Sequence, residues 1–184
     1  MSKLIVYCHP YDKSFNHVIL EKIKEHEDII GVIDLYKEKF SPIYTTEELE
    51  IYSAGKTLDD NVRRYQHLLL SADELIIITP IWWNNIPGML KGFFDKVMKV
   101  HFAYENTKMG VKGLLTNIKR SYVITTSNSP TWYIKLVAGN IINGSLKSTL
   151  KQIGVKKITW KNLGNIKSSS KVQRKKFLDE LKKI

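Results

Sequence analysis

Three short segments of the sequence carry side chains that could bind a ligand, and each follows an apolar run. The first, His9 to Asn16, contains a histidine, a serine hydroxyl and an asparagine amide. The second, Pro80 to Asn85, contains two adjacent tryptophans, Trp82 and Trp83. The third, Thr125 to Asn128, contains small hydroxyl and amide side chains. Hydroxyl, amide and aromatic groups together suit a polar ligand that has a flat ring.

The first segment is typical of a helix start that can bind an anion. Ser14 is a suitable N-cap, and the first turn of a helix presents backbone N–H groups without intrahelical partners. With the Asn16 amide and His9 nearby, these groups would cradle a phosphate. A capped helix beside a solvated histidine explains the same residues without a ligand, so this segment alone leaves both interpretations open. The G-x-G-x-x-G fingerprint of dinucleotide-binding folds is absent.

The second and third segments would contact a ring. Trp82 and Trp83 could form its wall, beside the Asn84 amide; alternatively, the two tryptophans plug the sheet edge or a subunit interface. Ser127 and Asn128 add hydrogen-bonding groups. The ligand would have a phosphate at one end and a flat heterocycle at the other, which indicates a flavin nucleotide. The sequence shows no cluster of metal ligands, so we expect no metal. The sequence contains no Ser-His-Asp set, Cys-His pair or H-E-x-x-H motif, so a cofactor would carry the chemistry.

The elements that position these segments follow from the apolar pattern, which alternates between short strand-like runs and longer amphipathic stretches. The third strand is expected to stop at Thr79 and Pro80, because proline cannot donate to a sheet ladder. Ser170 is expected to cap the last helix, and residues 101–116 to form a loop. Strands are predicted at 4–8, 29–35, 75–78, 121–125 and 157–160. Helices are predicted after Ser14 and at 58–70, 89–98, 133–137, 142–153 and 171–184.

Alternating strands and helices predict an α/β fold with right-handed crossovers. Five strands in a small chain favour a flavodoxin-like, doubly wound parallel sheet of order 2-1-3-4-5, with helices on both faces. In that order strands 1 and 3 lie at the switch point, so the loops after strands 1, 3 and 4 converge on one crevice. These loops are the three segments described above. We expect residues 1–184 to form a single flavin-binding domain.

Composition narrows the class of protein. The lone cysteine, Cys8, excludes an internal disulfide, and its position in a strand predicts an inert core thiol. No apolar run has the length of a signal peptide or a membrane span, so we expect a soluble, cytoplasmic protein without an integral membrane segment. The net charge of +11 comes largely from scattered lysines in the last third of the chain. Without a nucleic-acid-binding motif, these lysines predict a solvated basic face and no nucleic-acid partner.

Spaced motifs between the amino terminus and about residue 135 share the order of a known family. They are His9-Pro10 with Ser14-Phe15-Asn16, Asp34-Leu35-Tyr36 with Phe40 and Pro42, Pro80-Ile81-Trp82-Trp83 with Pro87 and Leu90-Lys91-Gly92-Phe93, Phe102-Ala103-Tyr104, and Thr125-Thr126. The sequence resembles the NAD(P)H:quinone oxidoreductase family of flavodoxin-like flavoproteins. Two departures are visible: Ser127-Asn128 stand where many members have two glycines, and Gly139 stands near the histidine of the animal enzymes.

The resemblance implies roles for the residues of the three segments. The phosphate side of the flavin would be held by His9, Ser14, Phe15 and Asn16. The isoalloxazine would be contacted by Pro80, Ile81, Trp82, Trp83, Thr125 and Thr126, with Asn84, Ser127 and Asn128 completing the cofactor site. Tyr133 would act catalytically at the nicotinamide and quinone face, where Phe102 and Tyr104 would also bind the substrate. The expected cofactor is FMN, with FAD the alternative, because the extended C-terminal region that helps the animal enzymes hold FAD is missing.

The function implied is an oxidoreductase that transfers a hydride from NAD(P)H, its co-substrate, through the flavin to a quinone or a nitro or azo compound. One alternative is a flavin-binding regulatory subunit of a potassium efflux system. Another is a non-enzymatic electron carrier of flavodoxin type. The second alternative is disfavoured, because such carriers are typically acidic and carry a T-x-T-G-like phosphate loop that this sequence lacks.

We also expect a homodimer whose interface completes the active site. The stretch from Trp82 to Ile86 and the segment with Phe102 and Tyr104 place more large apolar groups on the surface than a small monomer usually exposes. A flavin in a sheet-edge crevice is walled on one side only, and a two-fold partner would supply the second wall. Alternatively, the helix that starts near Tyr133 closes the crevice within one chain.

Overall fold

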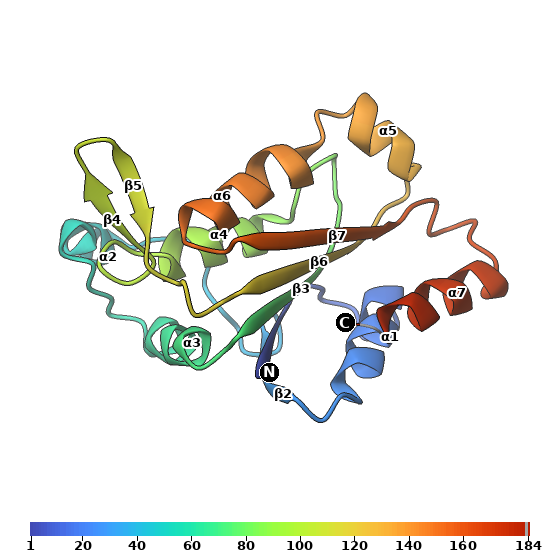
Figure 1. The fold of residues 1–184 in the computed structure, drawn as a ribbon, viewed down its shortest axis with the longest axis horizontal. Helices are drawn as coiled ribbons and strands as arrows, with labels where there is room; N and C mark the ends of the chain where they lie inside the picture. The colour runs from blue at the N-terminus through green and yellow to red at the C-terminus, as the bar shows by residue number, and fades with distance from the viewer. Residues whose placement is uncertain (183) are drawn as a thin grey trace.

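The computed structural model describes residues 1–182 and 184. Its central sheet has five parallel strands in the order β2-β1-β3-β6-β7 (Figure 1). Counted along the chain, these strands have the order 2-1-3-4-5, so the predicted fold class is confirmed. The strands are β1 (Lys3–Tyr7), β2 (Ile29–Asp34), β3 (Glu74–Pro80), β6 (Arg120–Thr126) and β7 (Lys157–Leu163).

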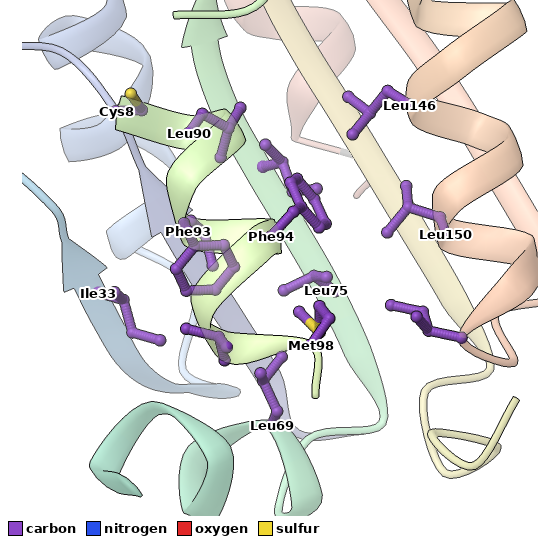
Figure 2. Packing of buried hydrophobic residues seen from close by; sticks show 14 of the residues in the cluster. Cys8, Ile33, Leu69, Leu75, Leu90, Phe93, Phe94, Met98, Leu146 and Leu150 are labelled. Carbon is purple, nitrogen blue, oxygen red and sulfur yellow. The ribbon is translucent and has the colours of Figure 1, made fainter. Parts of the chain in front are cut away.

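Helices cover both faces of the sheet, because alternate residues of the buried strands point to opposite sides. Leu75 and Ile77 of β3 belong to a core cluster with α3, α4 and α6, which Figure 2 shows with Leu75, Phe93 and Leu150. Ile76 and Ile78 pack against α1 and α7. The helices are α1 (Phe15–Lys24), α2 (Thr46–Glu50), α3 (Asp60–Leu70), α4 (Gly88–Val97), α5 (Thr131–Leu136), α6 (Lys147–Gln152) and α7 (Lys171–Leu181).

Side-chain caps fix the starts of several helices. The Ser14 hydroxyl accepts a hydrogen bond from the His17 N–H, which confirms the predicted start of α1. Ser170 caps α7 through a reciprocal pair of hydrogen bonds with Gln173, also as predicted. No helix within residues 1–182 combines the length and the apolar character needed to cross a bilayer.

The strand that leads into the tryptophan loop is longer than expected. The sequence predicts that the strand stops before Thr79, but β3 continues through Pro80, which pairs in register with Thr126. The ladder tolerates this proline because β1 ends at Tyr7, two positions earlier, and the N–H of Ile81 makes the next bond to β6. The loop therefore begins at the end of a rigid, fully buried strand.

Secondary structure is present in the region predicted as a loop and in a segment for which no helix was predicted. Residues 101–116 include an antiparallel hairpin, β4 (Tyr104–Thr107) and β5 (Gly110–Gly113), whose residues are mostly exposed and lack apolar alternation. The segment after β2 includes α2 and a 3₁₀ helix, Tyr52–Ala54. The predicted helix at 142–153 is a π-helical turn, Ile142–Leu146, followed by α6, and β7 extends three residues beyond Trp160.

Candidate functional site

The structure brings the three candidate segments together at the carboxyl edge of the sheet. The Asn16 amide at the start of α1 donates to the Thr126 hydroxyl at 2.8 Å. The Ile81 N–H, at the start of the tryptophan loop, donates to the Thr126 carbonyl, also at 2.8 Å. The rings of His9 and Trp82 meet edge-on, with their centroids 5.9 Å apart. One residue at the end of β6 thus joins the other two segments.

The amino terminus of α1 offers groups suited to a phosphate and its neighbouring hydroxyls. Asn16 is only 3% exposed, and within the described residues its Oδ1 atom has no hydrogen-bond partner. The Thr126 hydroxyl can accept or donate, so the amide can turn over, keep this bond and present its NH₂ group instead. The helix is ten residues long, and the N–H groups at its amino terminus have no partners within the helix. An orphaned amide beside a helix amino terminus fits a phosphorylated ligand.

The side chains of His9 and Phe15 mainly pack against neighbouring side chains of this chain. Burial lowers the pKa of the His9 imidazole, so the ring is uncharged at neutral pH, and its Nδ1 accepts from the Tyr11 N–H at 3.1 Å. The Phe15 ring lies near Phe177 of α7, with centroids 6.5 Å apart, and beneath the Arg174 guanidinium at 5.5 Å. The backbone of Phe15, in the first turn of α1, is therefore the part that remains for a ligand.

The tryptophan loop is a tight, strained turn. Trp82 and Asn85 exchange two backbone hydrogen bonds of 2.9 Å, and the two residues between them, Trp83 and Asn84, both have left-handed backbone angles, with φ of 48° and 61°. Such angles are rare for a bulky residue, and backbone strain of this kind concentrates at functional sites. The Trp83 side chain is 98% exposed, so within one chain it does not plug the sheet edge.

A cavity of about 450 Å³ lies between the tryptophan loop and the loop after β6. Seven of the residues predicted for the site line this cavity, together with Ser129, which the sequence did not single out. The lining residues are Ile81, Trp82, Trp83, Asn84, Ser127, Asn128, Ser129 and Tyr133. The tryptophan loop contributes two indole rings and an amide, while the loop after β6 contributes hydroxyl and amide side chains and α5 contributes Tyr133. Such a lining suits a flat heterocycle with polar edges.

Thr125 has a different position from the one expected. Its side chain is fully buried, and its hydroxyl bonds to Asn162 at 2.7 Å and to the Trp160 indole N–H at 2.8 Å, both on β7. Its side chain is therefore engaged with the neighbouring strand. Asn162 and Trp160 were not predicted, and no local motif marks them, because their partners lie 35 to 37 positions away in the sequence.

Phe102 and Tyr104 do not reach the cavity within one chain. Tyr104 lies on β4 and lines a separate groove of about 360 Å³, which α4, the hairpin and α6 enclose. Phe102 is half-buried and packs against the core. The hairpin lies at the opposite end of the molecule from α5, which carries Tyr133 (Figure 1).

Cys8 is not among the residues that line the cavity. Cys8 is fully buried, and burial raises the pKa of its thiol to about 12, so it is an inert core residue as predicted. Within residues 1–182 and 184, no group of three or more His, Cys, Asp or Glu side chains could hold a metal ion.

Relatives of this chain are found in bacteria and in mammals. An uncharacterized NAD(P)H oxidoreductase of Haemophilus influenzae is 28% identical over 185 residues, covering 97% of this chain and 91% of that protein. An FMN-dependent NADH:quinone oxidoreductase of Coprothermobacter proteolyticus is 35% identical over 113 residues, which is 60% of this chain and 56% of the relative.

Solved structures share the whole fold. Smu.1420 from Streptococcus mutans has a TM-score of 0.85 at 31% identity, covering 100% of this chain and 97% of its own. An NAD(P)H:quinone oxidoreductase from Methanothermobacter marburgensis also has a TM-score of 0.85, at 26% identity, with 100% and 94% covered. The family model of the flavodoxin-like fold matches residues 1–184. The chain therefore belongs to the flavodoxin-like fold family and, within it, to the NAD(P)H:quinone oxidoreductases.

Proposed function

We propose that this protein is an FMN-dependent NAD(P)H oxidoreductase that reduces quinones or similar planar acceptors, with azo and nitro compounds in the same class. The observation that carries the proposal is the meeting of three segments at one edge of the sheet. The tryptophan turn and the loop after β6 line one cavity, and the α1 amino terminus is hydrogen-bonded to the end of β6. The FMN-dependent quinone reductase of Coprothermobacter proteolyticus and the quinone reductase of Methanothermobacter marburgensis support this assignment.

Each of the three segments has a task in this proposal. Ser14, Asn16 and the first turn of α1 bind the FMN phosphate, while Trp82 and Trp83 flank the ring and exclude water. FMN held by these residues would supply the chemistry for hydride transfer between NAD(P)H and the acceptor. Tyr133 lies where a planar co-substrate would stack, and its phenol can donate a hydrogen bond to a carbonyl of the acceptor.

Anaerobic spectroscopy tests the reaction itself. Protein loaded with FMN is expected to lose the visible flavin absorption when NADPH or NADH is added and to regain it when a benzoquinone follows. FMN in the same buffer without protein is the control, because free flavin reacts with nicotinamide only slowly. If the bound flavin keeps its absorption with both nicotinamides, the protein is not an NAD(P)H oxidoreductase.

Replacing Trp83 with alanine is expected to weaken FMN binding by up to roughly tenfold, since aromatic stacking commonly contributes about 0.5–1.5 kcal/mol beyond area burial. Flavin fluorescence quenching measures the change. Trp132→Ala is a matched control, because Trp132 is also exposed and close in sequence to Tyr133 but does not line the cavity. Equal affinity in Trp83→Ala and wild type would show that Trp83 has no part in binding the ring.

We further propose that the active protein is a homodimer in which each site borrows Phe102 and Tyr104 from the other chain. In one chain these two residues lie away from the cavity, at the far end of α4. The exposed Trp83 ring and the groove beside Tyr104 are both largely apolar, so docking one against the other would bury both. A two-fold axis would create two such contacts at once.

Sedimentation and a complementation experiment test the dimer. Sedimentation at micromolar concentration is expected to show a species of twice the chain mass. A mixed dimer is then made from one chain with Phe102→Ala and Tyr104→Ala and another with Ser14→Asp. The first chain keeps its flavin site and the second keeps the aromatic pair, so the mixed dimer is expected to recover activity that neither parent shows. No recovery would contradict the shared site.

A further inference from the structure

One side chain on the neighbouring strand holds the loop after β6. Asn162, the penultimate residue of β7, lies directly opposite Thr125 in the sheet register. Its Oδ1 accepts from the Thr125 hydroxyl at 2.7 Å. Its Nδ2 donates to the Ser127 hydroxyl at 3.1 Å and to the Thr131 hydroxyl at 2.9 Å. A single amide thus connects the penultimate residue of β6, the first residue after β6 and the first residue of α5.

The direction of every bond in this network is determined by its two ends. The Trp160 indole N–H can only donate, so the Thr125 oxygen accepts from it and the Thr125 proton goes to Asn162. At the other end, the Ser127 hydroxyl donates to the Ser129 carbonyl at 2.8 Å, which leaves its oxygen to accept from Asn162. Only a side chain that accepts on one side and donates on the other completes the chain, and an amide does both.

The network lies directly behind the wall of the cavity. Ser127 is almost fully buried and lines the cavity, and α5 carries Tyr133 on the same wall. Two backbone bonds tie the same loop to the segment that follows Asn162: Ser127 N–H to the Leu163 carbonyl, and Ile166 N–H to the Ser127 carbonyl, both at 3.0 Å. Asn162 is not one of the residues that line the cavity in the described chain, so it acts on the cavity through Ser127 and Thr131.

We propose that Asn162 is a positioning residue of the flavin site. It fixes how far Ser127 and the start of α5 lie from the bound ring. This inference rests on the proposed function, because the ring is that of FMN. Without Asn162, the Ser127 hydroxyl loses its donor and Thr131 loses its tie to β7. The wall that faces the tryptophans then shifts, and with it the hydrogen bonds that a flavin receives along its polar edge.

The test measures FMN affinity and the visible spectrum of bound FMN in wild type and Asn162→Ala. Losing the two hydrogen bonds that Asn162 donates is expected to weaken FMN binding by roughly tenfold. The absorption maximum of the flavin that still binds is expected to shift. Thr159→Ala is the control, since Thr159 is an exposed residue of the same strand and is expected to leave both readouts unchanged.

A double-mutant cycle separates positioning from general destabilisation. If Asn162 acts through Ser127, the effects of Asn162→Ala and Ser127→Ala on FMN affinity are expected to be non-additive. Asn162→Asp keeps the size and the acceptor but cannot donate to Ser127 or Thr131. It is therefore expected to weaken FMN binding as well, and it takes the place of the alanine variant if that variant folds poorly. Wild-type affinity and spectrum in Asn162→Asp, or full additivity in the cycle, would overturn the inference. A wild-type protein that does not bind FMN would instead overturn the proposed function.

Discussion

Replacing Ser14 with aspartate is expected to lower the affinity for FMN by at least roughly 100-fold, because a like charge placed against a bound ion costs several kcal/mol. Ser14 caps α1, and its hydroxyl lies where the helix amino terminus would bind the phosphate. Aspartate is as good an N-cap as serine, so the helix and the overall stability are retained. The carboxylate then occupies the place of the phosphate and repels it. Isothermal titration with FMN measures the loss.

A variant with an uncharged N-cap residue at position 14 is the matched control for the aspartate variant. Ser14→Asn also accepts the hydrogen bond from the His17 N–H but carries no charge, so it is expected to stay within several-fold of wild type. Riboflavin lacks the phosphate and is expected to bind the aspartate variant and wild type with similar affinity. Equal losses for FMN and riboflavin in Ser14→Asp would contradict a phosphate site at the start of α1.

The largest loss of stability is expected from replacing Lys96 with alanine. Lys96 is 2% exposed, and its ammonium pairs with Glu48 at 3.1 Å and Asp59 at 3.3 Å. It also donates to the Ile43 carbonyl, so this one group holds α2 and the start of α3 against α4. Removing one partner of a buried ion pair leaves uncompensated charge and costs about 3–5 kcal/mol. For a domain of this size, the melting temperature is expected to fall by roughly 10 °C.

The same helix offers a control for Lys96. Lys91 of α4 pairs with Asp95, but both side chains are largely exposed, and such pairs contribute about 0–1 kcal/mol. Lys91→Ala is therefore expected to leave the denaturant midpoint almost unchanged. If urea unfolding shows that both variants lose the same free energy of unfolding, burial does not determine how much these ion pairs stabilise the protein.

The fold could be predicted because its strongest signals are local. The apolar run from Leu75 to Ile78 has the length and β-branched composition of a strand buried on both faces, and β3 is buried throughout. The alternation of strands and helices then limits the topology to a few choices. The hairpin could not be predicted in this way, because its residues are mostly exposed and lack apolar alternation. The start of α2 does have a local sequence pattern. Thr45 and Glu48 form a capping box, whose sequence pattern is T-x-x-E.

The candidate site was predictable only in part. The sheet order places the tryptophan turn and the loop after β6 at one edge, so Trp83 and Ser127 could be brought together from topology alone. The roles of Thr125 and Asn162 depend on hydrogen bonds between strands β6 and β7. Side-chain pairing of this kind follows from the sheet register, which no local pattern reveals. Phe102 was likewise assigned to the site by its motif, whereas its distance from the cavity appears only in three dimensions.

Titration of the purified protein with FMN and with riboflavin tests the flavin site most directly. FMN is expected to bind one molecule per chain in the micromolar range or tighter, with its fluorescence quenched by the adjacent tryptophans. Riboflavin is expected to bind at least roughly tenfold more weakly, because charge-assisted hydrogen bonds to a phosphate contribute about 1.5–3 kcal/mol. A protein that neither quenches nor retains FMN, or that binds both flavins equally, would contradict the assignment of the three loops.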